Sequence, residues 1–172
     1  MNRFVALILM TFVSAVGSLH AQSAPLSAQA KADYTSIKNI LLKSADKMPD
    51  EDYSFRTTPQ VRTYGEMIAH ITDAQMTLCG IAKGEPQHSN AGKLTSKADL
   101  SAALKASFDY CDPVYDSMTD TMGLQPVKMF GQDRTKLGVL FVNVTHDNEM
   151  YGQMVAYMRI KGIVPPSSEG RP

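Results

Sequence analysis

The stretch Thr145–Gly162, THDNEMYGQMVAYMRIKG, decides the fold expected for this 172-residue chain. With the residues just before it, this stretch forms two stripes at the three-to-four spacing of a helix. One stripe contains Val139, Val142, His146, Met150, Gln153 and Tyr157, and the other contains Leu140, Val144, Tyr151, Val155 and Met158. Because a helix that is apolar on both sides is buried, the pattern predicts an inner helix of a bundle.

Three further helices are predicted, and no alternating strand pattern competes with them. The expected helices are about Ser27–Met48, Thr63–Gly84, Thr95 to Asp112-Pro113, and Thr135–Lys161. Thr63 and Glu66 have the spacing of a capping box, Gly84 is a helix terminator, and Pro113 should kink or restart the third helix. Connections of about thirteen residues are long enough to return along a helix, so crossover topologies are allowed. The fold class is all-α.

The first 21 residues resemble a secretory signal peptide. Arg3 precedes an apolar run from Phe4 to Val16, and small residues lead to Ala21. We expect cleavage after Ala21, with Ala24 as the alternative, and a periplasmic or secreted mature protein. The remaining chain is interpreted as one helical domain over residues 22–166 and a flexible tail over residues 167–172, with no later membrane span.

Charge and cysteine content narrow the classes of partner and compartment. Loss of Arg3 with the leader leaves 16 basic against 17 acidic residues, which argues against nucleic acid as a partner. In an oxidising compartment, Cys79 and Cys111 are expected to form a disulfide worth roughly 3–4 kcal/mol in the chain-entropy model. The alternative is a pair of buried, inert thiols.

Histidines mark the candidate site. His70 and His146 each fall in the middle of a predicted long helix, whereas His88 lies in a polar loop. Two imidazoles that face each other across a bundle core suit a transition metal such as zinc, nickel or iron. Two ligands alone, however, do not make a tight site.

The segments YGEMIAHITDAQ, starting at Tyr64, and THDNEMYGQMVAYMRIKGIVPPSS, starting at Thr145, resemble the DinB-like (YfiT-like) family of metal-dependent four-helix proteins. The resemblance covers essentially the whole mature chain. It implies a four-helix bundle, typically up-down-down-up, and a divalent metal held by three histidines. His70 and His146 match the first two ligand positions, and Met150 occupies the third.

Three interpretations of the third position stay open. Glu149, Asp73 or Glu66 completes a site of two histidines and one carboxylate. Met150 itself ligates, which would favour copper(I) because a thioether is soft and neutral. Alternatively, the metal is weakly bound or absent, and the histidines are hydrogen-bonded core residues beside Met150.

The sequence indicates a class of protein but not a specific reaction. Tyr151 and Gln153 are candidates to line a cleft for an unknown small molecule, although burial of Tyr151 in the core is an equal alternative. No nucleophile motif such as G-x-S-x-G is present. The leading hypothesis is an exported DinB-like protein of unassigned reaction with an incomplete metal site. The alternatives are a non-catalytic binding or structural module and, from the resemblance, a metal-dependent thiol S-transferase-like enzyme; the resemblance also allows a homodimer.

Overall fold

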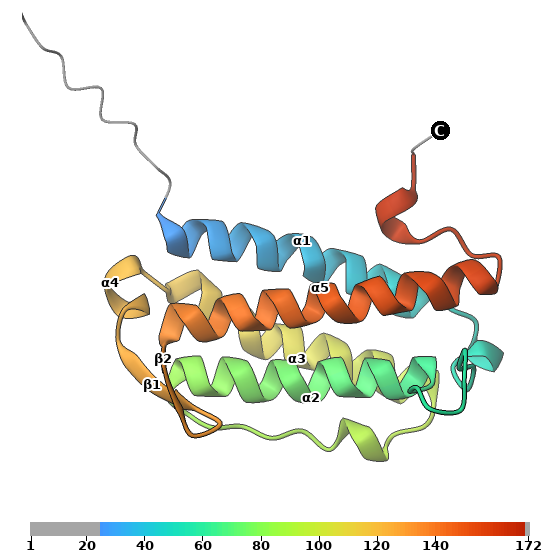
Figure 1. Ribbon diagram of the computed structural model, residues 1–172, viewed down its shortest axis with the longest axis horizontal. Coiled ribbons are helices and arrows are strands. Elements are labelled where there is room, and N and C mark those ends of the chain that lie inside the picture. Colours follow the sequence, from blue (N-terminus) through green and yellow to red (C-terminus); the bar gives the residue numbers. More distant parts are fainter. Residues whose placement is uncertain (1–24, 171–172) are drawn as a thin grey trace, which may run out of the picture.

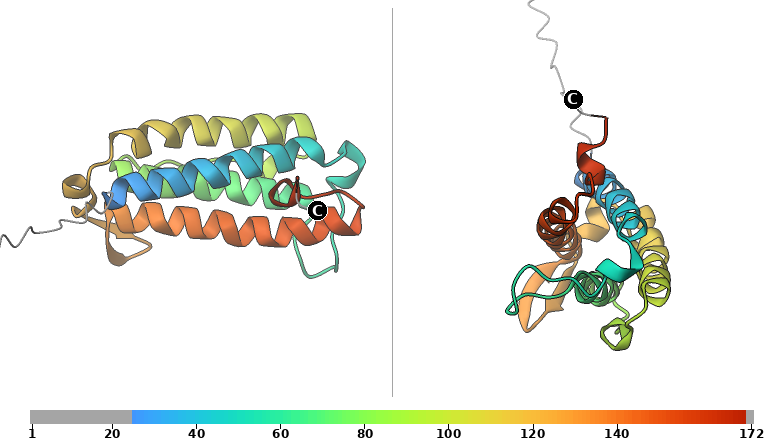
Figure 2. Two further views of the ribbon diagram at one scale, coloured as in Figure 1. Left: turned by 90° about the horizontal axis from the view of Figure 1, so that it is seen from above. Right: turned by 90° about the vertical axis from the view of Figure 1, so that its right-hand side faces the viewer.

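Four long helices form a bundle in the computed structural model, which describes residues 25–170 (Figure 1). They are α1 (Leu26–Lys47), α2 (Tyr64–Lys83), α3 (Lys97–Ser117) and α5 (Lys136–Ile160). α1 and α5 run in one direction and α2 and α3 in the other, which is the expected up-down-down-up order. α2 packs on α3 and α5, and α1 packs on the same two helices (Figure 2).

Short elements fill the connections. They are the 3₁₀ turns η1 (Asp50–Asp52), η2 (Ala91–Lys93) and η3 (Pro166–Ser168), the helical turn α4 (Asp120–Gly123), and the antiparallel strands β1 (Pro126–Met129) and β2 (Gln132–Thr135). The all-α class is therefore confirmed, but the sequence did not predict the short hairpin before α5. Each strand has four residues and buries little, so neither shows the period-two apolar pattern that identifies a strand.

The ends of α2 follow the predicted capping chemistry. The Thr63 side chain accepts from the Glu66 amide, and the Glu66 side chain accepts from the Thr63 amide. At the other end, Gly84 takes a left-handed φ of 86°. This conformation favours glycine because a Cβ would clash there. The helix that carries His70 is thus stopped at both ends by local sequence.

Pro113 neither ends nor restarts the third helix, because α3 continues through it to Ser117. A proline in a helix interior loses one backbone donor and clashes with the preceding turn. Tertiary packing outweighs that cost here: Val114 and Tyr115, directly after the proline, are buried, and the Tyr115 ring stacks on Tyr34 with centroids 3.9 Å apart.

The core lies between the four long helices and is rich in aromatic and branched side chains. Its largest fully buried members include Tyr64, Tyr115, Phe108, Ile37, Leu41, Met67, Ile68, Ile71, Leu100, Leu104 and Leu140. The predicted disulfide is present: Cys79 on α2 and Cys111 on α3 are joined, with Cα atoms 5.5 Å apart. The disulfide therefore links the two parallel helices inside this core.

The described part of the C-terminal segment contacts the bundle. The Tyr151 hydroxyl donates to Ser167 Oγ at 2.7 Å and accepts from the Ser167 amide. Lys47 pairs with Glu169 at 2.5 Å. The predicted leader lies outside the described residues, and within them no helix is both long and apolar enough to cross a membrane.

Candidate functional site

The two predicted histidines meet between α2 and α5. Their Nε2 atoms are 3.1 Å apart, and the rings are steeply inclined, with centroids 5.0 Å apart. Both side chains are partly buried. Helix periodicity places each imidazole on the inward face, so a site predicted from two segments 76 residues apart is brought together by the fold.

The protonation of His70 is compatible with a ligand role. Burial lowers the pKa of the His70 imidazole, and the positive charge of Arg62 and the proximity of His146 lower it further. Asp73 and Glu149 act in the opposite direction with smaller effect. At neutral pH His70 is therefore a neutral imidazole, the form that binds a metal.

The distance between the two Nε2 atoms is that of a hydrogen bond between the imidazoles, and it also fits two ligands of one ion. Metal–nitrogen bonds of about 2.0–2.1 Å allow both nitrogens to reach the same cation. His146 Nδ1 is buried without a hydrogen-bond partner and lies 3.7 Å from Asp147 Oδ1, which is also unpartnered. This separation is too long for a hydrogen bond. It nevertheless puts a carboxylate next to the second ring nitrogen, where metal-bound histidines have their orienting partner.

The other expected ligands are poorly placed to bind a metal ion. Met150 is buried at 5% exposure, and the described residues contain no group of three or more histidine, cysteine or acidic side chains close enough to share an ion. Glu66 is engaged in the α2 cap and pairs with Arg56 at 3.7 Å, and Asp73 accepts from the Ala91 amide at 3.2 Å. Glu149 is exposed. Two imidazoles fit a metal, but a third strong donor is not in place.

A buried polar network lies behind the histidine pair, and the sequence did not reveal it. Gln75 donates to Asp147 Oδ2 at 2.8 Å and accepts from Asn143 at 2.7 Å, and the Asn143 amide is also 3.2 Å from the Tyr115 hydroxyl. Gln75, Asn143 and Asp147 are fully buried. Their spacing offered a signal, because Asn143 and Asp147 are four residues apart and share one face of α5.

Burial dominates the electrostatics of this network. It raises the pKa of the Asp147 carboxyl to about 6, and the neighbouring His146 only partly offsets this increase. Desolvation disfavours the charged form of a carboxyl, and one Asp147 oxygen has no donor to compensate. The network therefore contains a carboxyl that exchanges its proton close to neutral pH.

An apolar hollow of about 390 Å³ opens over the histidine pair. Besides His70 and His146, its walls are formed by Asp73, Ala74, Thr77, Leu78, Phe130 and Val142. Phe130 lies at the tip of the β1–β2 hairpin, where it is 76% exposed and has a φ of 50°. The hairpin that sequence reasoning missed thus supplies one wall of the candidate site.

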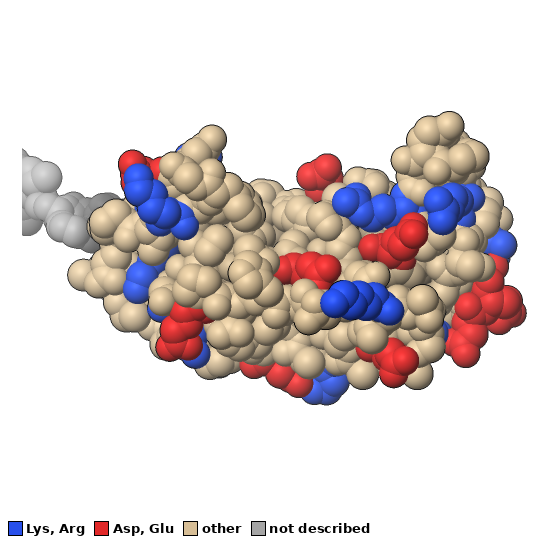
Figure 3. Space-filling view, turned by 90° about the horizontal axis from the view of Figure 1, so that it is seen from below, with Lys and Arg blue, Asp and Glu red and all other residues tan. Residues whose placement is uncertain are grey.

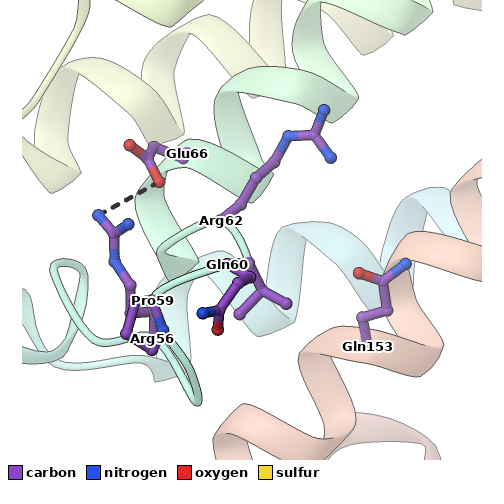
Figure 4. Close-up of a pocket in the computed structure, with 7 residues that line it drawn as sticks. Arg56, Pro59, Gln60, Arg62, Glu66 and Gln153 are labelled. Atoms are coloured by element: carbon purple, nitrogen blue, oxygen red, sulfur yellow. Dashed lines mark ion pairs between the residues drawn. The ribbon is translucent and has the colours of Figure 1, made fainter.

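A second hollow, of about 600 Å³, lies at the loop before α2 and is called here the loop hollow (Figure 4). It is lined by Arg56, Pro59, Gln60, Val61, Arg62, Glu66 and Gln153. A smaller hollow of about 200 Å³ shares Arg62 with the loop hollow and His70 with the apolar hollow. Of the two residues expected to line a cleft, Gln153 lies in the wall of the loop hollow, whereas Tyr151 is buried and hydrogen-bonded to Ser167.

Comparisons with known proteins agree with this architecture. Residues 34–154 match the model of the DinB superfamily. A DinB-like protein from Bacillus cereus is 20% identical, with a TM-score of 0.72 over 81% of this chain and 95% of its own. One from Bacillus subtilis is 17% identical, with a TM-score of 0.65 over 78% and 92%.

A third solved structure is the mycothiol-dependent maleylpyruvate isomerase, with 13% identity and a TM-score of 0.62 over 77% of this chain and 60% of the isomerase. At such identities these likenesses show the fold. No match was found among curated proteins. Because the superfamily model covers well over half of its length, including both histidines, the chain belongs to the DinB superfamily.

Proposed function

We propose that this protein is an exported DinB-superfamily member in which His70 and His146 form an incomplete, low-affinity site for a divalent transition metal, open to a small molecule. The observation that carries this proposal is the 3.1 Å approach of the two Nε2 atoms. The missing third strong donor separates it from a tight metalloenzyme site, for which three protein ligands are usual.

The surrounding residues support the assignment of roles. With a proton on His146 Nδ1, facing Asp147, the Nε2 lone pair points toward His70. The Gln75 amide holds the other Asp147 oxygen at 2.8 Å, so the carboxylate cannot turn away freely. The negative charge of Asp147 would thereby favour the His146 tautomer with its proton on Nδ1. A bound divalent ion would supply Lewis acidity to a ligand oxygen or sulfur in the hollow.

Export is supported by two features of different kinds. The first is the leader-like N-terminus, and the second is the buried Cys79–Cys111 disulfide. Disulfides persist mainly in oxidising compartments. Secretion can be measured directly by locating the full-length protein in cell fractions and determining the N-terminus of the mature chain, for which Gln22 is expected.

Metal analysis of wild type, Met150→His and a His146→Ala/Met150→His double variant tests the metal site. After loading with zinc or nickel and gel filtration, we expect wild type to retain far less than one ion per chain and Met150→His to retain close to one. The double variant should lose that gain. Elemental analysis should include copper, because Met150 is a soft donor.

Other outcomes would contradict the proposal in distinct ways. Near-stoichiometric metal in wild type that is lost in His70→Ala would show a complete site with a donor not identified above. A folded Met150→His variant that binds no metal would show that the histidine pair is a hydrogen-bonded core contact. That result would favour a non-catalytic module over the thiol transferase, which needs the ion.

A further inference from the structure

The hollows on either side of the histidine pair differ in chemistry, and this difference indicates a class of ligand. Toward the hairpin, Val142, Leu78, Ala74 and Phe130 make the wall mostly apolar. Toward the start of α2, the loop hollow is polar: its wall includes two arginines, two glutamines and Glu66. The hollows adjoin, because His70 lines the apolar hollow and the small one, and Arg62 lines the small one and the loop hollow.

Arg62 is positioned to bind an anion. Its backbone carbonyl accepts from the Tyr157 hydroxyl at 2.7 Å, which holds this part of the loop on α5. No carboxylate of the described residues lies within ion-pair distance of its guanidinium, whereas Arg56 already pairs with Glu66. Figure 4 shows Arg62 extending away from that pair.

The two nearby acidic side chains are engaged by other partners. Glu66 accepts from the Thr63 amide at 2.6 Å and faces Arg56, and Asp73 accepts from the Ala91 amide.

Phe130, in the wall of the apolar hollow, has an unusual backbone conformation. Phe130 and Gly131, the two residues of the hairpin turn, have φ values of 50° and 80°. Such a turn favours Asn-Gly, and an aromatic residue there carries a backbone cost. The Phe130 ring is largely exposed beside the apolar hollow, so a ligand that fills the hollow would cover this ring.

From these features we propose that the three adjoining hollows bind a small amphiphilic carboxylate, its head on Arg62 and its apolar body along α2 and α5 under Phe130. Glu66 and Thr77 are eleven positions apart in α2, which corresponds to about 16 Å of helix, a length suited to a medium-chain acid. The proposal takes its location from the site proposed above but needs no bound ion.

The surface charge does not attract anions in general. The outer face seen in Figure 3 carries acidic and basic side chains of mixed sign with broad uncharged areas between them. Because the formal net charge of the chain is also zero, long-range attraction of anions is small, and recognition depends on the local guanidinium. An amphiphilic cation of the same length should therefore bind much more weakly than the acid.

Isothermal titration of full-length mature protein tests this proposal, using decanoate below its micelle concentration in the presence of a chelator. Decylammonium controls for charge and acetate for chain length. We expect decanoate to bind at least tenfold more tightly than either control. Arg62→Gln should weaken decanoate about tenfold, whereas Arg159→Gln, which removes an exposed guanidinium bonded to Ser168, should not.

Phe130→Asn separates binding from folding. Asparagine suits a positive φ better than phenylalanine, so the variant should be at least as stable as wild type while binding decanoate about fivefold more weakly. Leu124→Ala, which truncates another exposed apolar side chain, is the matched control.

Three results would overturn the proposal: no decanoate binding, equal binding of decanoate and decylammonium, or equal effects of Arg62→Gln and Arg159→Gln. Repeating the decanoate titration with added zinc distinguishes this proposal from that of the metal site. Decanoate binding that requires zinc would place the carboxylate on the ion, which supports the metal site and overturns the role of Arg62. Arg62-dependent binding in chelator supports the ligand class whatever the metal result.

Discussion

Asp147 is the residue at which the fold bears the clearest electrostatic cost. Its carboxyl is completely buried, one oxygen has no hydrogen-bond partner, and its pKa rises from the ordinary 3.8 to about 6. A carboxyl whose pKa is higher in the folded than in the unfolded chain stabilises the fold only while protonated. That contribution is full below about pH 4 and is lost as the pH rises through 6.

Asp147→Asn should therefore increase the free energy of unfolding relative to wild type at pH 7, by up to roughly 3 kcal/mol, and the difference should shrink toward pH 4. Urea denaturation in chelator between pH 4 and 8 measures it. Asp109→Asn, at an exposed carboxyl paired with Lys105, is the control and should show no such trend. Parallel stability profiles for wild type and Asp147→Asn would contradict the buried-charge explanation.

At the scale of single elements, the connection from α2 to α3 is fitted closely against α2. A Cβ added to Gly80 would lie 2.7 Å from the Gln87 amide nitrogen and 2.8 Å from the Glu85 carbonyl oxygen. Both are backbone atoms, so the connection itself would have to move.

Gly80→Ala should consequently destabilise the protein by about 1–3 kcal/mol. Gly152→Ala is the matched control on α5, because its Cβ would meet nothing within 4 Å. That variant should be neutral or stabilising by up to about 1 kcal/mol, since alanine is the better helix former. Chemical denaturation measures the free energy of unfolding of both variants. Equal changes would show that the close approach of the connection to Gly80 does not affect stability.

The capping box at the start of α2 gives a second element-scale prediction. Thr63→Ala removes the acceptor for the Glu66 amide and should cost about 1 kcal/mol of stability. Thr145→Ala removes only a bond from an exposed hydroxyl to the Val142 carbonyl within α5 and should be close to neutral. Thermal unfolding of the two variants compares them; a shift in Thr145→Ala as large as in Thr63→Ala would refute the role of the cap.

Across the whole molecule, the elements predicted best are those with a local cause. The capping box and the Gly84 terminator are encoded within a few residues, and inward-facing stripes brought His70 and His146 together. The hairpin before α5 was missed because its short, mostly exposed strands lack an apolar alternation. Burial of Asp147 was missed because it depends on Gln75, 72 residues away, which no local pattern reports.

The disulfide is expected to stabilise the whole molecule. Reduction, or the Cys79→Ala/Cys111→Ala double change, should lower the free energy of unfolding by roughly 3–4 kcal/mol without changing the helical content. Denaturant titrations with and without reductant, followed by circular dichroism, measure both quantities. An unchanged midpoint in the reduced protein would show that packing alone holds α2 on α3.

The parallel course of α2 and α3 has a consequence for how the chain matures. Since the connection between them must travel back along the bundle, the two thiols do not become neighbours through a local helical hairpin. They meet once long-range docking is under way, the slower part of folding. With only two cysteines in the sequence, no incorrect pairing exists within one chain. Oxidative maturation of a monomer therefore calls for an oxidase but no isomerase.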